Sequence, residues 1–377
     1  MAEGGVMGGG GSGGDENDGS LWINTRWRMD LLVNHHARFC LRLLHSLPGD
    51  CEELETQRMT VLQFAVTSLD ILNQIHLIKD ELKHRIVAWV YRLQITEDPP
   101  DRCGFQGSPT FLMNEHTNIH LPPRVVASHV AMTYAALVTL ITLGDDLCHV
   151  QRKKILHGLS TLQNSNGSFR AGYGCSESDM RFAYCAVCIC YILNDFSTIN
   201  VPKLIEFIRR SFSYEGCFTS GHAVEGHAGH TFCAVASLVI LGKLHETLCE
   251  DEINKLVKWC LFRQGETGGF TGRTNKAEDT CYSYWVGGTL ALLDSLPFID
   301  CDKNIDFVLG NQNPLSGGIG KVDSEHVDPL HTFLGLAGLS LVKYKGLNLM
   351  NPMLTTSNNA SEHLSNLHRQ WNTSGLN

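Results

Sequence analysis

Residues 251–293, DEINKLVKWCLFRQGETGGFTGRTNKAEDTCYSYWVGGTLALL, predict two helices of opposite character joined by a glycine turn. The first, Asp251 to Arg263, places charged and apolar residues on different faces and is amphipathic. The second, Tyr282 to Leu293, is apolar on almost every side, so it has to be buried. The turn between them contains Gly269-Phe270. This stretch therefore predicts a helical hairpin with one surface helix and one core helix.

The same hairpin recurs along the chain with a period of about fifty residues, which indicates an internal repeat. The turn motif appears as Cys103-Gly104-Phe105, Gly167-Ser168-Phe169, Gly216-Cys217-Phe218, Gly269-Phe270 and Gly318-Ile319. The apolar helices are expected to begin at Ser128, Asp179, Gly229, Asp279 and Pro329, each fifty or fifty-one residues after the last. Strand-like alternation is nearly absent, so the fold class is all-α.

The simplest architecture for such hairpins is an α/α toroid of the α6-α6 barrel type. The apolar helices would form its inner ring and the amphipathic helices, such as Pro202 to Arg210, its outer ring. An open solenoid is the alternative, but it would leave the apolar helices half exposed.

The two ends of the chain differ in composition from the repeats. Residues 1–20 are Gly-rich and are expected to be disordered, while residues 21–350 form the barrel domain. Residues 351–377 are expected to be a polar tail with one short helix, Glu362 to Trp371. Residues 96–123 are rich in Pro, Asn and His and are expected to form a long loop.

Composition excludes several classes of protein. The net charge of −9 argues against a nucleic-acid binder, which normally has a basic surface. The longest apolar run, Val130 to Leu143, is too short and too interrupted to span a bilayer. Many of the 14 cysteines lie in apolar helical runs, and the N-terminus has no signal-peptide pattern. We therefore expect free, reduced thiols and a cytoplasmic protein.

The repeat brings distant polar residues to equivalent places at one rim of the ring. One such place is held by Ala131, Arg181, Thr231, Cys281 and His331. Cys281 and His331 belong to consecutive repeats, and Asp279 lies two residues before Cys281. A carboxylate, a thiolate and an imidazole would supply three ligands to zinc and leave a fourth position open, as in catalytic zinc sites.

Asp279 and Cys281 can reach one metal ion only at a helix start, because a spacing of two residues points side chains to different faces of a regular helix. Asp279-Thr280 has the composition of such a start. A helix N-terminus would also lower the pKa of Cys281. The alternative is that Cys281 is a core cysteine and His331 a hydrogen-bonded core histidine.

Basic residues and a phenol gather at the same rim. Arg273 and Lys276 precede Asp279, His227 lies near the equivalent place one repeat earlier, and Tyr282 follows Cys281. Such donors would match the charge of a diphosphate. The alternative is that Arg273 and Lys276 belong to a solvated loop.

The inner helices also supply aromatic side chains to the centre of the ring. These are Tyr134, Phe182, Tyr184, Phe232, Tyr284 and Trp285. Most of them are expected to pack the core, but a wide centre would leave an apolar funnel suited to a long hydrocarbon.

At these residues the chain resembles the β subunits of protein prenyltransferases, from about Leu31 to Lys343. The motifs that carry the resemblance are Asp279-Thr280-Cys281-Tyr282-Ser283-Tyr284-Trp285, Asp179-Met180-Arg181-Phe182-Ala183-Tyr184-Cys185 and Asp328-Pro329-Leu330-His331. Within this family the chain resembles the β subunits of type I geranylgeranyltransferases, through Cys103-Gly104-Phe105-Gln106-Gly107, His129-Val130-Ala131-Met132-Thr133-Tyr134 and Gly272-Arg273-Thr274-Asn275-Lys276.

Three positions separate this subtype from farnesyltransferases. Thr60 and Leu334 occupy positions at which the resemblance places a bulky Trp and Tyr in farnesyltransferases. The smaller side chains here would leave a larger pocket, which would admit a twenty-carbon lipid. Lys321 stands where they carry an Asp that recruits magnesium. The resemblance therefore implies zinc dependence without a magnesium requirement.

The resemblance also implies a role for each candidate residue. Asp279, Cys281 and His331 would bind zinc, which activates the cysteine thiol of a C-terminal Cys-a-a-X protein, and Lys321 would assist catalysis. The diphosphate would be held by His227, Arg273, Lys276 and Tyr282, and the isoprenoid flanked by Arg181, Tyr134, Tyr184, Cys185 and Trp285. The pocket for the terminal X residue, usually Leu, would be lined by Thr60, His129, Ala131 and Phe182.

The implied partners are an obligate α subunit, geranylgeranyl diphosphate and Cys-a-a-X proteins such as Rho/Rac-type small GTPases. Three rival functions remain open: a farnesyltransferase β subunit, a Rab-type prenyltransferase β subunit and a non-catalytic α/α-toroid binding module.

Overall fold

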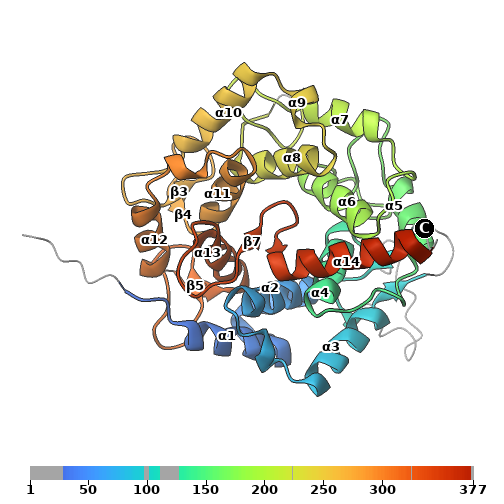
Figure 1. Cartoon of the computed structure of the whole chain (residues 1–377), viewed down its shortest axis with the longest axis horizontal. Helices are drawn as coiled ribbons and strands as arrows, with labels where there is room; N and C mark the ends of the chain where they lie inside the picture. The colour runs from blue at the N-terminus through green and yellow to red at the C-terminus, as the bar shows by residue number, and fades with distance from the viewer. Residues whose placement is uncertain (1–28, 97–101, 111–126, 223, 324, 375–377) are drawn as a thin grey trace, which may run out of the picture.

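Two concentric rings of helices form the body of the molecule in the computed structural model, which describes residues 29–96, 102–110, 127–222, 224–323 and 325–374 (Figure 1). Six helices form the inner ring: α2 (Arg58–Ile71), α4 (Val130–Thr142), α6 (Met180–Ile192), α8 (Ala228–Ile240), α11 (Tyr282–Leu292) and α13 (Pro329–Leu341). Each packs against the next, and α13 packs against α2, so the ring closes. The predicted toroid is confirmed, and the open solenoid is wrong.

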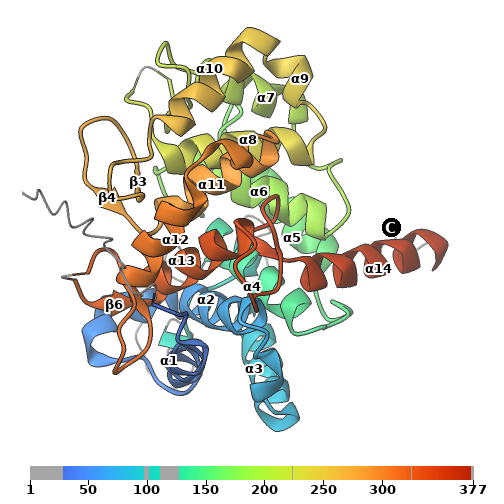
Figure 2. The same ribbon diagram turned by 60° about the vertical axis from the view of Figure 1, so that its left-hand side comes forward.

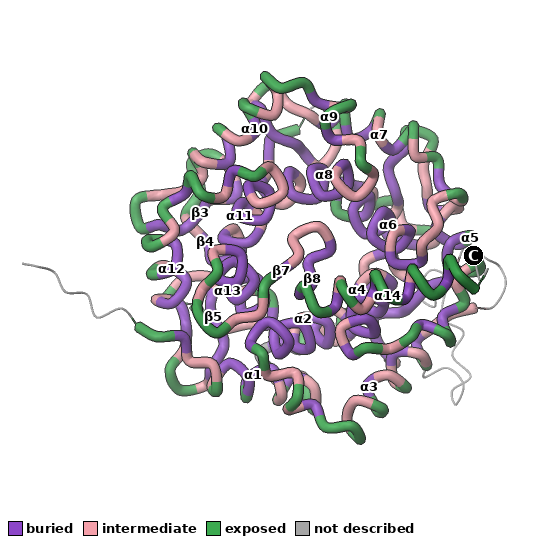
Figure 3. Tube along the Cα trace, in the orientation of Figure 1, coloured by how far each residue is buried: buried purple, intermediate pink, exposed green. Residues whose placement is uncertain are grey.

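Six further helices lie outside the inner ring and alternate with it along the chain. They are α1 (Val33–His45), α3 (Asp80–Arg92), α5 (Arg152–Thr161), α7 (Val201–Arg210), α10 (Glu250–Leu261) and α12 (Cys301–Gly310). Short helical turns connect the hairpins: η1 (Gly49–Gln57), η2 (Ile75–Leu77), α9 (Leu244–Thr247) and η5 (Leu296–Phe298). In Figure 3 the inner helices are mostly buried, while exposed residues concentrate on the outer ring and its loops, as the apolar and amphipathic patterns predict.

Four pairs of short antiparallel strands lie in the connections between helices in the described residues. They pair β1 (Gln94–Ile95) with β2 (Gly104–Phe105), β3 (Phe270–Thr271) with β4 (Glu278–Asp279), β5 (Ile319–Gly320) with β6 (Val327–Asp328), and β7 (Met350–Asn351) with β8 (Thr356–Ser357). The β3–β4 and β5–β6 hairpins lie on neighbouring repeats and lead directly into α11 and α13. They therefore bring the starts of these two inner helices to one rim.

A glutamine at the end of several outer helices joins each repeat to the next. The side-chain oxygen of Gln264 accepts from the backbone N–H of Asp300 at 2.9 Å, and its amide donates to the Asp300 carbonyl at 2.9 Å. Gln163 makes the same pair of bonds with Asn200. Gln312 accepts from the backbone N–H of Leu32 at 3.1 Å and donates to the backbone carbonyl of Asp30 at 3.0 Å. The last repeat is thus joined to the first by the same pair of glutamine–backbone hydrogen bonds that joins the other repeats.

The segment after residue 350 is more ordered than the polar tail that its composition predicts. Helix α14 spans Asn358–Ser374, and one face of it is buried against the toroid through Ala360, Leu364, Leu367 and Trp371. We call residues 350–357, which form the β7–β8 hairpin, the C-terminal hook; Figure 1 shows it inside the ring, while Figure 2 shows α14 running outward. The expected short helix, Glu362 to Trp371, lies within α14, which packs on the toroid because its four apolar residues, spaced three and four apart, make one helical stripe.

The expectations for the N-terminus and for the long loop fall mainly on residues outside the described ranges. Residues 1–20 lie outside the described residues, as does most of the predicted 96–123 loop, of which residues 96 and 102–110 are described. None of the helices in the described ranges combines the length and apolar character that crossing a membrane requires. No disulfide joins the cysteines there, and most of their side chains are buried.

Candidate active site

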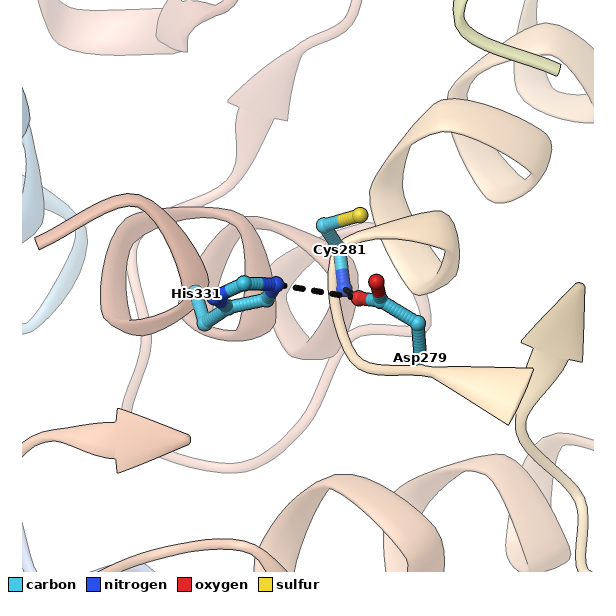
Figure 4. A group of neighbouring side chains, drawn as sticks. All are labelled: Asp279, Cys281 and His331. Atoms are coloured by element: carbon cyan, nitrogen blue, oxygen red, sulfur yellow. Dashed lines mark hydrogen bonds and ion pairs between the residues drawn. The ribbon is translucent and has the colours of Figure 1, made fainter. Parts of the chain in front are cut away.

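Asp279, Cys281 and His331 meet at the rim where α11 and α13 begin (Figure 4). Their ligand atoms lie within 4.8 Å of one another, and Nε2 of His331 is 3.1 Å from Oδ1 of Asp279. Asp279 ends β4, Cys281 is the N-cap of α11 and His331 lies in the first turn of α13. The spacing of fifty residues therefore brings Cys281 and His331 together, as the repeat predicted.

The second ring nitrogen of His331 is held by a carboxylate that sequence reasoning did not single out. Nδ1 of His331 lies 2.5 Å from Oδ2 of Asp328, and the backbone N–H of His331 donates to Oδ1 of Asp328 at 2.9 Å. A carboxylate on the outer nitrogen is the usual support of a metal-binding histidine. Its signal was available, because Asp328 precedes Pro329 in the pattern of a helix N-cap.

Two carboxylates, Asp279 and Asp328, favour positive charge at this place. Burial alone would lower the pKa of His331, but hydrogen bonds to Asp279 and Asp328 raise it to about 9. Burial and then the Asp279 carboxylate raise the pKa of the Cys281 thiol. The expected lowering of that pKa by the helix start is therefore wrong for the metal-free chain, since desolvation and a neighbouring negative charge outweigh it. The oxygen, sulfur and nitrogen donors suit a transition-metal ion, whose charge would favour the thiolate.

Lys321 lies on the neighbouring hairpin and is tied to the same place through its backbone. Its carbonyl oxygen accepts from the backbone N–H and from the hydroxyl of Thr280, both at 3.0 Å. Thr280 stands between Asp279 and Cys281, so Lys321 is held beside the triad. Its ammonium group lies 3.5 Å from Glu325 and remains partly exposed.

His227 and Tyr282 form a second polar group at this rim. The Tyr282 hydroxyl lies 3.2 Å from Nε2 of His227, and Nδ1 of His227 accepts from the N–H of Gly229 at 3.1 Å. Glycine at 272 leaves room for Tyr282, since a Cβ there would lie 2.2 Å from the Tyr282 hydroxyl and the ring would have to shift. The close approach of this loop and Tyr282 follows from the lack of a side chain at that position.

The two cations of the β3–β4 hairpin are more solvent-accessible than the His227–Tyr282 pair. Arg273 forms an ion pair with Glu225, and Lys276 is exposed in the hairpin loop. Arg181 is also paired: its guanidinium contacts Asp179 at 2.6 Å and Glu177 at 2.7 Å. An anionic ligand that used Arg181 or Arg273 would have to compete with these carboxylates.

A cavity of about 1050 Å³ opens inside the inner ring. Most of the predicted lipid and peptide residues line it: Thr60, His129, Ala131, Tyr134, Arg181, Phe182, Tyr184, Cys185, Trp285 and Leu334. His227 and Leu330, the neighbours of Tyr282 and His331, line it as well, so the cavity reaches the rim beside the triad. Lining residues that sequence reasoning missed include Phe64 and Phe333, whose rings stack at 5.1 Å, and Thr355 of the C-terminal hook.

These features, a closed α/α toroid with an acid–thiol–imidazole group beside a deep apolar cavity, define a prenyltransferase fold. A family model described as the prenyltransferase alpha-alpha toroid domain matches residues 31–358, and the chain belongs to this family. The β subunit of geranylgeranyl transferase type-1 from Dictyostelium discoideum is 33% identical over 339 residues, covering 86% of this chain and 95% of the relative. Its counterpart from Arabidopsis thaliana is 31% identical over 337 residues, covering 85% and 88%.

A solved structure agrees with these relatives. Protein geranylgeranyltransferase-I of Candida albicans, complexed with GGPP, has a TM-score of 0.80 at 26% identity and covers 90% of this chain and 99% of its own. The type II terpene cyclase MstE from Scytonema, at 13% identity and a TM-score of 0.53, shares the fold alone. The chain is thus a protein prenyltransferase of the type-1 geranylgeranyl β-subunit kind, which confirms the resemblance predicted from its motifs.

Proposed function

We propose that this chain is the catalytic β subunit of a heterodimeric protein geranylgeranyltransferase type I. It would transfer geranylgeranyl from geranylgeranyl diphosphate to the cysteine of C-terminal Cys-a-a-X proteins, with X usually Leu. The observation that carries the proposal is that the cavity and the triad are linked through neighbouring residues. His227 lines the cavity and contacts Tyr282, and Tyr282 directly follows Cys281. A thiol at the triad would therefore lie beside the diphosphate end of a lipid in the cavity.

Zinc is the metal that best suits the donors of Asp279, Cys281 and His331, one ion per β subunit. When bound, it would supply a Lewis acid that lowers the pKa of a substrate thiol. Asp279 and a deprotonated Cys281 would balance its charge, and Asp328 would hold the His331 ring in the orientation that leaves Nε2 for the metal.

The remaining polar residues would act on the leaving group. The substrate sulfur forms a bond to C1 of the lipid as the C1–O bond to diphosphate breaks, so negative charge grows on the diphosphate. His227 and Tyr282 can donate to it from their shared position, with Arg273 and Lys276 drawn from the hairpin loop. Lys321, held beside Thr280, would supply a fixed cation there, which is why we expect no magnesium requirement.

The cavity would hold both the lipid and the end of the peptide. Arg181, Tyr134, Tyr184, Cys185 and Trp285 would flank the isoprenoid, with Thr60 and Leu334 leaving room for its fourth unit. Thr60, His129, Ala131 and Phe182 would line the pocket of the X residue, and the rings of His129 and Phe182 meet edge to face at 5.7 Å. We further propose a cytoplasmic enzyme with an α subunit as obligate partner and Rho/Rac-type small GTPases among its substrates.

The decisive experiment compares twenty- and fifteen-carbon prenyl diphosphates on a peptide ending in Cys-a-a-Leu, with the chain co-purified with an α subunit. We expect preference for the twenty-carbon donor, with and without magnesium, and no product from a matched Ser-a-a-Leu peptide. Preference for the fifteen-carbon donor, or strict magnesium dependence, would favour a farnesyltransferase β subunit. A complex with no bound zinc and no turnover would favour a binding module.

A further inference from the structure

Three inner-ring tyrosines direct their hydroxyl groups at one turn of the C-terminal hook. Tyr134 of α4 donates to the carbonyl of Leu354 at 2.9 Å, Tyr184 of α6 to that of Met353 at 3.1 Å, and Tyr284 of α11 to that of Pro352 at 3.3 Å. Residues 134, 184 and 284 occupy equivalent places in their repeats. The inner ring therefore presents a layer of donors that holds the hook from three sides.

The base of the hook is held as firmly as its tip. The Ser357 hydroxyl donates to the Asp70 carboxylate at the end of α2, and the amide of Asn348 donates to the Asp70 carbonyl at 2.7 Å. Ser340 of α13 accepts from the backbone N–H of Met350 at 2.8 Å. Because its contacts reach α2, α4, α6, α11 and α13, the hook is fixed across most of the ring.

The hook fills the part of the ring that lies beyond the cavity. On α4 the lining residues end at Ala135, although the helix continues to Thr142. Seven further residues extend a helix by about 10 Å. The turn 352–355 lies directly beyond the lining tyrosines, so the cavity ends at the hook rather than running through the ring.

Thr355 is the hook residue that lines the cavity in the described part of the chain. Its hydroxyl lies 2.8 Å from that of Tyr184, and the residue is 4% exposed. It adopts a φ of +56°, a left-handed conformation that is strained for a β-branched residue. Such strain persists only where the surroundings hold it, and it is often found at ligand sites.

We infer that Thr355 is a specificity-determining residue, which forms the floor of the lipid cavity and limits the length of the prenyl donor together with Thr60 and Leu334. This inference rests on the proposed prenyl transfer. A longer side chain at 355 would occupy space that the end of a twenty-carbon lipid needs, while a fifteen-carbon lipid would still fit. Removing the side chain would deepen the cavity.

The test measures kcat/KM for fifteen-, twenty- and twenty-five-carbon prenyl diphosphates with the αβ enzyme carrying Thr355→Met or Thr355→Gly. Methionine is not β-branched, so it adds volume without adding backbone strain, and glycine relieves the strain at positive φ. Tyr184 keeps its bond to Met353 in both variants. The control is Thr356→Val, a buried neighbour of similar shape that does not line the cavity.

Thr355→Met is expected to lower the ratio of twenty- to fifteen-carbon kcat/KM about tenfold or more, as loss of a few methylenes of pocket length does. Thr355→Gly is expected to raise the use of the twenty-five-carbon donor relative to the twenty-carbon one. If Thr355→Met does not fold, the test rests on the ratio of twenty-five- to twenty-carbon kcat/KM in Thr355→Gly. If the wild type prefers the twenty-carbon donor and the Thr355 variants keep the same kcat/KM ratios, Thr355 does not form the floor of the cavity. An equal shift in Thr356→Val would also overturn that assignment. A wild-type enzyme that transfers no prenyl group would instead contradict the proposed function.

Discussion

Nδ1 of His331 lies 2.5 Å from Oδ2 of Asp328, three residues earlier in the same helix start. The contact fixes the ring so that Nε2 faces Asp279. Asp328→Asn keeps the shape but removes the charge, and we expect metal affinity to fall about 10- to 100-fold. Chelator competition measures this. Asp323→Asn, an exposed carboxylate in the loop of the same hairpin, should bind metal as the wild type does; equal affinity in both variants would contradict the role of Asp328.

Cys281 supplies the one sulfur ligand of the triad. Cys281→Ala is expected to abolish zinc binding and thioether formation, because two remaining ligands hold zinc too weakly. Metal content of the purified αβ complex and single-turnover product formation are the measurements. Cys148→Ala removes an exposed thiol in the loop between α4 and α5 and should change neither. Turnover in Cys281→Ala would refute the ligand assignment.

Lys321 is expected to replace magnesium at the leaving group. Lys321→Asp should lower turnover without magnesium by about tenfold or more, and millimolar magnesium should restore part of it, since a carboxylate can recruit the ion. The matched control is Lys153→Asp on the outer helix α5, which makes the same charge change at an exposed position. No magnesium response in Lys321→Asp would place this lysine away from the diphosphate.

Thr60 lines the cavity, and its hydroxyl lies 3.3 Å from the sulfur of Met132. Thr60→Trp is expected to reduce kcat/KM for the twenty-carbon donor about tenfold or more while the fifteen-carbon donor is used as well or better. Competition between the two donors gives the ratio directly. Thr60→Ser, which removes only a methyl group, is the control. An unchanged ratio in Thr60→Trp would show that the lipid does not reach α2.

His36 of α1 helps to close the ring, and it makes the stability of the folded chain depend on pH. The ring is fully buried, bonded to Gln312 at 3.0 Å and to the N–H of Gly318 at 3.0 Å. Burial lowers the pKa of His36 to about 4, so the folded chain binds its proton less readily than the unfolded chain. Its stabilising contribution is complete above pH 6.5 and is lost as pH falls toward 4.

Lowering the pH from 7.5 to 5.5 should therefore reduce the free energy of unfolding by about 1.4 kcal/mol through His36. Urea unfolding of the wild type and of His36→Asn at both pH values isolates this term. The variant is expected to be less stable at pH 7.5 and to lose less on acidification. An equal pH dependence in the two proteins would assign the effect to other groups.

Much of the fold and part of the site could be predicted because both follow the repeat. Apolar helices that recur every fifty residues have to face one another in a closed ring, and equivalent positions such as Cys281 and His331 then meet. The cavity residues Tyr134 and Tyr184 follow from the same register. Asp328 was missed because its role depends on the direction of one imidazole nitrogen, which spacing does not reveal.

The charges around the rim also depended on contacts that no spacing shows. Arg181 and Arg273 are paired with carboxylates, and burial and the Asp279 carboxylate raise the pKa of the Cys281 thiol. Residues 351–357 have no helical or strand period, so the sequence predicts only a polar tail where the structure has the C-terminal hook. Its place is set by tyrosine hydroxyls more than sixty residues away.

By itself the sequence determined the toroid, the three residues of the candidate metal site and the class of enzyme, since periodicity, ligand chemistry and family motifs can be read from the chain alone. Only the tertiary structure decided where the cavity ends, which carboxylate orients His331 and which cations are already paired. These properties depend on side chains from several repeats meeting in space. Their positions follow from packing across the ring, and each depends on atoms that are far apart in the sequence.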